Sequence, residues 1–275
     1  MAHTLQERYS KLIDLKLRAT LVKKDGVVFN NRYEGDPKAG MVKIPVRDTE
    51  VTVADYSKTD GAGASHGDTA YLDVSVNKDK YVNEIIDGYD AAAVPDDMVA
   101  DRLDSAAYSM ALQIEKDATT ELESSATTFG DTTALDKDTI YDTIVDVRTK
   151  MSEAYVPNDN RRFLLVSPTV FGLILKSPEF IRATTLGDSV VQTGAAGRIA
   201  GFNVFEDATL SATTDFIAGH PDWCTRVNEW SVPVHLQDIN GSGKYIGASA
   251  VQGRRIYAHK VTKAKTLYIK KNAGG

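Results

Sequence analysis

The feature that most constrains this chain is a pair of alternating segments with no evident partner elsewhere in the sequence. Apolar residues recur at every second position in both segments: Val42, Ile44 and Val46, then Leu72, Val74 and Val76. A period of two predicts two strands, and together they predict a long hairpin over about residues 40–77. A lone two-stranded ribbon is marginal in water because a second layer must cover its apolar face. We therefore expect another copy of the chain to supply that cover.

The hairpin has two further marks. Pro45 cannot donate a ladder hydrogen bond, which predicts an edge strand. Val51 and Val53 continue the alternation past Arg47, and residues 58–68 then form a stretch of small residues with three glycines, typical of a flexible loop tip. The tip contains Lys58 and few side chains that could pack.

A long helix is predicted from Pro95 to about Ser124. Proline suits the first helical position, and Asp96 and Asp97 complement the positive end of the helix dipole. Apolar residues recur at spacings of three and four along one face: Val99, Leu103, Ala107, Met110, Ile114, Ala118 and Leu122. Such a helix is roughly 45 Å long at 1.5 Å per residue, which indicates a supporting role in a larger structure.

The remainder mixes helices and strands irregularly, which favours an α+β fold. A second helix is indicated by Ile140, Ile144, Val147, Met151 and Tyr155, and Ser167-Pro168 is typical of a short helix start. The apolar run 162–166 predicts a buried strand. Further strands are expected within 199–205, 216–219, 226–230, 255–257 and 267–269.

Charge is unevenly distributed along the chain. Residues 1–24 carry six Lys/Arg against two Asp/Glu, residues 251–275 carry seven Lys/Arg and no acid, and the net charge is nevertheless −6. The region between is therefore strongly acidic. Solvation of exposed ends explains this, and so does attraction between the basic ends of one copy and the acidic body of another. Nucleic-acid binding is a third explanation, but no aromatic interleaving or known module accompanies it.

No catalytic constellation is recognisable. The five histidines are scattered without metal-ligand spacing, and the single cysteine, Cys224, excludes intrachain disulfides and cysteine clusters. Cys224 is better interpreted as a small core residue than as a nucleophile. No apolar run is long enough for a membrane span, and charges interrupt the N-terminus where a signal peptide would need an apolar core. We expect no enzyme activity, cofactor, metal or membrane contact.

The order of these features resembles the major capsid proteins of tailed bacteriophages with the Hong Kong 97-type fold. Two motifs carry the resemblance beside the hairpin: Pro157-Asn158-Asp159-Asn160-Arg161-Arg162-Phe163-Leu164-Leu165-Val166-Ser167-Pro168, and Gly197-Arg198-Ile199-Ala200-Gly201-Phe202-Asn203-Val204. The resemblance covers nearly the whole chain. It implies an N-terminal arm (1–34), an extended loop with its return strand (35–90), a spine helix of the peripheral domain (91–127), an axial domain (128–247) and a return to the peripheral domain (248–275).

The resemblance also implies a function. Copies would assemble through pentamers and hexamers into an icosahedral head around double-stranded DNA, bound without sequence specificity, with a separate scaffolding protein and a portal as partners. Synthesis would occur in the bacterial host cytoplasm and the protein would end in the virion. The hairpin residues expected at the subunit interface are Val42, Lys43, Ile44, Val46, Arg47, Lys58, Leu72, Val74 and Val76, with the basic ones meeting acidic surfaces.

Three alternatives stay open at this point. An encapsulin-type compartment shell has the same fold and encloses a cargo protein in place of DNA. A tail or tube protein would form rings or tubes. A hydrolase using an Asp/Glu pair would be a monomer that turns over a substrate.

Overall fold

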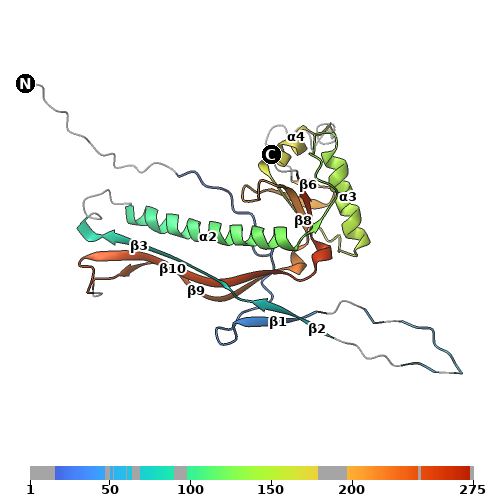
Figure 1. Ribbon diagram of the computed structural model, residues 1–275, viewed down its shortest axis with the longest axis horizontal. Helices are drawn as coiled ribbons and strands as arrows, with labels where there is room; N and C mark the ends of the chain where they lie inside the picture. The colour runs from blue at the N-terminus through green and yellow to red at the C-terminus, as the bar shows by residue number, and fades with distance from the viewer. Residues whose placement is uncertain are drawn as a thin grey trace, which may run out of the picture.

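Two β-sheets and a projecting hairpin make up the protein in this computed structural model (Figure 1). The structure describes residues 16–46, 50–51, 53–59, 61–63, 69–89, 98–178, 197–240 and 243–272. Helix and strand together form an α+β fold, as the sequence predicts. Among the described residues, no helix has an apolar stretch that could cross a membrane.

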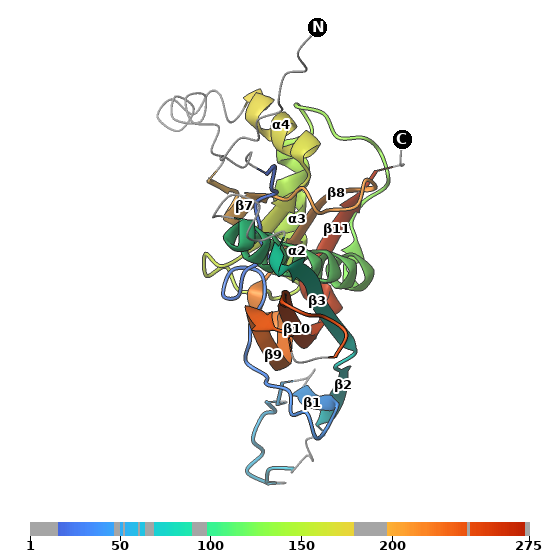
Figure 2. The same cartoon turned by 90° about the vertical axis from the view of Figure 1, so that its left-hand side faces the viewer.

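The long sheet is antiparallel and is built from segments far apart in the sequence. Its strand order is β3 (Lys78–Asp87), β10 (Ala248–Val261), β9 (Cys224–Asp238). Helix α2 (Met98–Ser125) lies along one face of this sheet, as Figures 1 and 2 show. The predicted helix start at Pro95 lies outside the described residues.

The broad sheet forms the core of a second body. Its strand order is β4 (Thr127–Thr128), β11 (Tyr268–Lys271), β8 (Thr214–Gly219), β5 (Phe163–Val166), β7 (Phe202–Glu206), β6 (Arg198–Ile199). Helices α3 (Ile140–Glu153) and α4 (Pro168–Lys176) pack on one face. The opposite face packs against the end of α2 and against Val28 and Phe29 of the N-terminal segment. Ser167 caps α4 as predicted, its Oγ accepting from the Val170 N–H at 3.4 Å.

Helix α2 joins the two bodies because it contributes to both cores. Its Met110 and Ile114 pack with Tyr257 of the long sheet, whereas Ala118 and Leu122 belong to the core beneath the broad sheet. The predicted apolar stripe is confirmed with one exception: Ala106 is buried and Ala107 is exposed. The sequence offered two adjacent alanines, and only the neighbouring sheet decides between them.

Two other predictions need correction. Tyr155 lies beyond the end of α3, has a positive φ of 59° and is 93% exposed. It therefore does not extend the buried stripe of that helix. The segment 199–205 is a hairpin, not one strand, because Ala200 and Gly201 both have positive φ and form the two-residue turn between β6 and β7.

The two sheets cut across the ranges that the family resemblance implies. Strand β9 falls within 128–247 yet pairs with β10 in the long sheet, and β11 falls within 248–275 yet lies in the broad sheet. The short 3₁₀ segments η1 (Pro221–Trp223) and η2 (Ala264–Thr266) stand where the chain passes between the two sheets.

The hairpin consists of β1 (Met41–Val46) and β2 (Ala70–Ser75), paired antiparallel with Ile44 opposite Leu72. It projects from beneath the long sheet, away from both bodies (Figure 1). The described ladder is shorter than predicted: β1 ends at Val46, and neither Val51 nor Val53 is part of a strand.

Candidate assembly surfaces

The base of the hairpin is covered by its own chain, which corrects the expectation that another copy covers it. Ile44 and Val74 are each only 1% exposed. They pack with Val227 of β9 and Ala258 of β10, and Tyr33 joins the same cluster. The remaining predicted interface residues of the ribbon are partly buried around this cluster: Val42, Val46, Leu72 and Val76.

The residues that cover the hairpin base could not be predicted from the sequence because they lie far from it along the chain. Val227 and Ala258 follow the hairpin by more than a hundred residues and sit in strands that serve mainly the long sheet. Bridges from Asn30 to Thr225 and from Glu34 to Asn228 hold the segment preceding β1 against β9. The direction of the hairpin is therefore set within one subunit.

The charged residues expected at the interface are placed differently. Lys43 faces Asp73 across the ladder, with Nζ and Oδ1 4.0 Å apart and both side chains exposed, so its acidic partner belongs to the same hairpin. An exposed pair of this kind contributes little stability. Lys58 is exposed near the turn closed by Ser57 and Gly61. Arg47 lies outside the described residues.

The outer part of the hairpin exposes apolar side chains. Val51 is 64% exposed, Val53 94% and Tyr56 72%. None of the three belongs to a hydrophobic core cluster of the described residues. The signal of this exposed apolar surface in the sequence is the alternation of Val51 and Val53.

The face of the long sheet opposite α2 is covered at Ala258 by the hairpin base and is open farther along the strands. Tyr81 and Ile85 of β3 lie on this face at 75% and 41% exposure, and Trp230 of β9 at 43%. Arg254 lies 5.6 Å from the Trp230 ring centre and pairs with Asp79 at 2.5 Å. Exposed aromatic side chains beside an arginine are typical of protein interfaces. This face was not predicted from the sequence.

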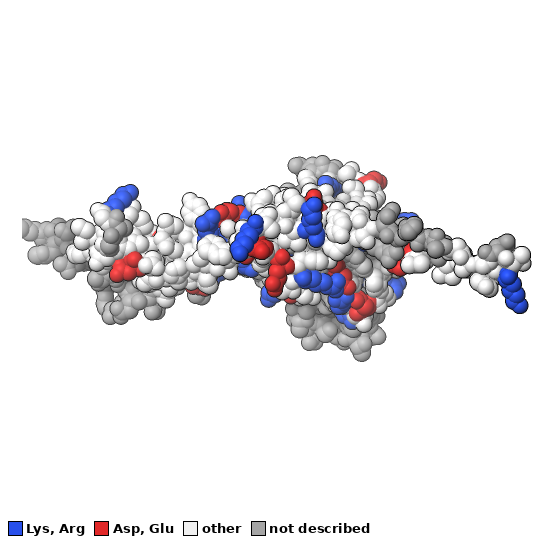
Figure 3. Space-filling model, turned by 90° about the horizontal axis from the view of Figure 1, so that it is seen from below, with Lys and Arg blue, Asp and Glu red and all other residues white. Residues whose placement is uncertain are grey.

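Several basic side chains within the described parts of the two ends pair with acids of the same chain, an outcome that none of the three explanations anticipated. Lys16 pairs with Asp101 and Arg18 with Asp104, both at 2.5 Å, so the N-terminal segment runs along α2. At the other end, Lys270 pairs with Asp131 at 3.2 Å. Acidic and basic side chains are accordingly intermixed over the body seen in Figure 3.

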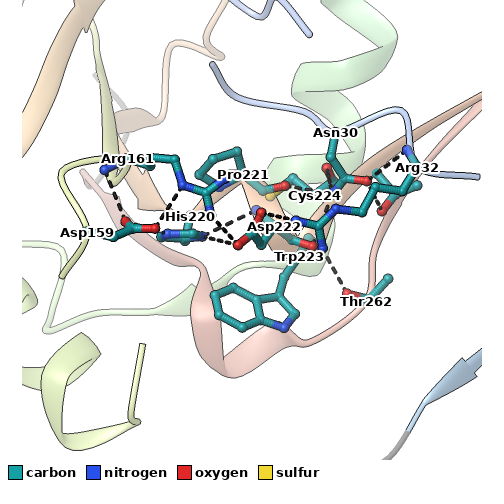
Figure 4. A network of polar contacts seen from close by, with 11 residues as sticks. Asn30, Arg32, Asp159, Arg161, His220, Pro221, Asp222, Trp223, Cys224 and Thr262 are labelled. Atoms are coloured by element: carbon teal, nitrogen blue, oxygen red, sulfur yellow. Dashed lines mark hydrogen bonds and ion pairs between the residues drawn. The ribbon is translucent and has the colours of Figure 1, made fainter. Parts of the chain in front are cut away.

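A polar network joins the two bodies where β8 leads into β9 (Figure 4). Asp222 pairs with Arg32 of the N-terminal segment at 2.5 Å and with Arg161, while Arg161 Nε donates to Asp159 at 2.8 Å. His220 is fully buried between the acids: its Nδ1 accepts from the Asp222 N–H at 3.3 Å, so its Nε2 donates to Asp159 at 3.0 Å.

The donor set of this network argues against a metal centre. Asp159, His220 and Asp222 offer ligand atoms within 4.8 Å of one another. However, two arginines already neutralise the carboxylates, and both ring nitrogens of His220 have partners. Burial raises the pKa of Asp159, but the hydrogen bonds from Arg161 and His220 outweigh it and hold that pKa well below its usual range. The network is therefore an ion-pair junction.

Cys224 occupies the core beside this junction. It is fully buried, and desolvation raises the pKa of its thiol far above the ordinary value. A thiol that stays protonated is a poor nucleophile. The interpretation of Cys224 as a small core residue is confirmed.

Comparison with known proteins identifies the fold. The protein aligns with a solved structure from Mycobacterium phage Che8 at a TM-score of 0.80, with 21% identity over 98% of both chains. It aligns with the capsid structure of Cyanophage P-SCSP1u at 0.80, with 10% identity over 98% of this chain and 93% of the other. The mature capsid of bacteriophage PhiM1 matches at 0.70, with 14% identity over 95% and 92%.

Sequence comparison gives the family. No curated protein sequence matches the chain. The model of the phage capsid protein family matches residues 71–225, more than half of the chain, from the return strand of the hairpin to the start of β9. The chain therefore belongs to the phage capsid protein family and is a structural component of a virion.

Proposed function

We propose that this protein is a major capsid protein with the Hong Kong 97-type fold, whose copies form an icosahedral head around double-stranded DNA. The observation that carries the proposal is the agreement along 98% of both chains with a phage structure at a TM-score of 0.80. Helix α2 would be the spine helix, the hairpin the extended loop, and residues 1–34 the arm.

The domain assignment follows the sheets. The long sheet with α2 would be the peripheral domain, and the broad sheet with α3 and α4 the axial domain, around which subunits cluster as pentamers and hexamers. Four sequence ranges would then each contribute mainly to one domain: 35–90, 91–127, 128–247 and 248–275. The chain would cross to the other domain at β9 and at β11.

Assembly in this proposal uses the outer hairpin. Val51, Val53 and Tyr56 are exposed in the single subunit and would be buried against a neighbouring copy. Burial of apolar surface contributes about 25 cal/mol per Å², and many repeated contacts in a shell add up. Lys58, and Arg47 beyond the described residues, would lie at the same contact. Scaffolding protein, portal and host-cytoplasmic synthesis belong to the same proposal and rest on the resemblance alone.

The test is a triple substitution, V51S/V53S/Y56S, with V51L/V53L/Y56F as the matched control that keeps the apolar surface. The serine variant is expected to stay folded by circular dichroism and to yield no stable shells by negative-stain electron microscopy, whereas the control assembles. Normal particles from the serine variant would refute the proposed role of the hairpin. Nuclease-protected DNA inside particles from infected cells separates a phage head from a protein-filled compartment.

A further inference from the structure

One basic and two acidic side chains meet inside the protein. Lys23 comes from the N-terminal segment, Glu115 from the middle of α2, and Asp207 from the loop that follows β7. The side chains of Lys23 and Asp207 are fully buried, and that of Glu115 is 6% exposed. Lysine and carboxylate side chains are almost never buried so completely unless they are paired, as these three are.

The amine of Lys23 is in direct contact with both carboxylates. Its Nζ makes a short contact to Oδ2 of Asp207 and lies 3.4 Å from Oε2 of Glu115. The other oxygen of Glu115, Oε1, accepts from the Lys23 backbone N–H at 2.8 Å. This second bond fixes the Glu115 carboxyl so that Oε2 faces the amine.

The two oxygens of Asp207 have different surroundings. Oδ1 accepts from the Thr209 N–H at 2.9 Å and from the Thr209 hydroxyl at 2.7 Å. Oδ2 faces the Lys23 amine instead. Two donors on one oxygen stabilise negative charge that develops there when a nucleophile attacks the carboxyl carbon, as the donors of an oxyanion hole do.

The charges in the cluster do not balance, because one ammonium faces two carboxylates. Burial raises the pKa of Glu115 even though Lys23 and its backbone N–H oppose the shift. A buried ion pair can also relieve its desolvation cost by transferring a proton, which leaves a neutral amine and a carboxylic acid. The site thus provides a nucleophile, an electrophile and a carboxyl group able to carry a proton.

We propose that Lys23 and Asp207 condense to form an intramolecular amide bond, with Glu115 as the proton carrier. A proton passes from the Lys23 ammonium to Oδ2 of Asp207, and the neutral Nζ attacks the Asp207 carboxyl carbon. Glu115 takes a second proton from the nitrogen and returns it to Oδ2, which leaves as water. The ammonium and carboxylate become one neutral amide and one water molecule, so no oxidant or other reagent is needed.

The contact between the Lys23 amine and the Asp207 carboxyl lowers the barrier to condensation. Groups held in contact and in the correct orientation react with effective molarities of roughly 10⁵–10⁸ M in favourable cases. Condensation also removes one buried positive and one buried negative charge, which relieves their desolvation cost. The product would tie the N-terminal segment covalently to the body that contains the broad sheet.

The mass of the denatured protein tests the proposal directly. We expect the wild-type chain to be lighter than its sequence mass by one water molecule. Trypsin should fail to cleave after Lys23 and should release a branched peptide that joins residues 19–24 to residues 199–226. A wild-type mass equal to the sequence mass, in both free subunits and assembled particles, would overturn the proposal.

Variants separate the condensation from other losses of water. K23R and E115Q should both keep their full sequence mass. D207N should lose ammonia in place of water and give the same branched peptide, because the amide formed is identical. A mass deficit that persists in K23R, or a branch at other residues, would also overturn the assignment; the wild-type measurement decides even if a variant fails to fold.

Discussion

Substitution of Ile44 by alanine tests whether the hairpin base is anchored within one subunit. Ile44 is 1% exposed and packs with Val74, Val227 and Ala258. Truncating a buried isoleucine costs about 2–5 kcal/mol, and the lower figure applies here because only one layer covers the ribbon. A loss of about 2 kcal/mol raises the equilibrium constant for opening the hairpin roughly 30-fold.

Hydrogen exchange on unassembled subunits measures this opening. Amides of β1 and β2 should exchange roughly 30-fold faster in I44A, while the broad sheet keeps its protection because the hairpin opens locally. I85A is the matched control: it removes the same atoms from a site that is 41% exposed on the open face of the long sheet, and it should leave hairpin exchange unchanged. Equal exchange of β1 and β2 in I44A and wild type would refute own-chain anchoring.

Three further predictions concern single contacts. G219A should lower the stability of the subunit by about 1–3 kcal/mol, seen as a lower midpoint in urea, because a Cβ there would lie 2.5 Å from Leu267 Cδ1 and 2.6 Å from Phe163 Cζ; an unchanged midpoint would show that this core is not tightly packed. R254A should leave the urea midpoint of unfolding almost unchanged, since its pair with Asp79 is half exposed, and a clearly lower midpoint would show that the pair anchors the sheet. Hydrogen bonds from the Thr133 hydroxyl and N–H, with a contribution from Lys270, lower the pKa of Asp131 to about 2. Because the folded pKa lies below the unfolded value of about 4, this contribution to stability is present above pH ~4 and is lost as the pH falls toward ~2; D131N should flatten that part of the stability profile, and an unchanged profile would contradict the assignment.

Local signals in the sequence predicted local structure well. The buried stripe of α3 is confirmed at Ile140, Ile144, Val147 and Met151, and Ser167 caps α4 through its own side chain. These features succeed because helix periodicity and capping depend on residues within one or two turns. Strand β5 is also confirmed: its signal is a short apolar run within the segment itself, and the run is buried at every position.

Features that depend on contacts between distant residues could not be predicted from the sequence. The cover of Ile44 comes from Val227 and Ala258, and the partner of Lys16 is Asp101. Neither contact produces a periodic pattern in the sequence, because each joins a single side chain to an element far away along the chain. The open face of the long sheet was missed for a related reason: Tyr81 and Trp230 come to lie on one face of a sheet only when β3 and β9 are placed on either side of β10.

The internal anchor of the hairpin changes how its role in assembly should be understood. Ordering a flexible segment at the moment of association costs conformational entropy, and that cost is subtracted from the gain in buried surface. Here the base of the hairpin is already packed against β9 and β10 in the single subunit. The exposed Val51, Val53 and Tyr56 follow this fixed base, so less of the hairpin has to be ordered when a neighbouring subunit binds. Changes at the base should therefore weaken the subunit and its shells together, whereas changes at the outer residues should weaken shells alone. The two classes of variant separate folding from assembly along one hairpin.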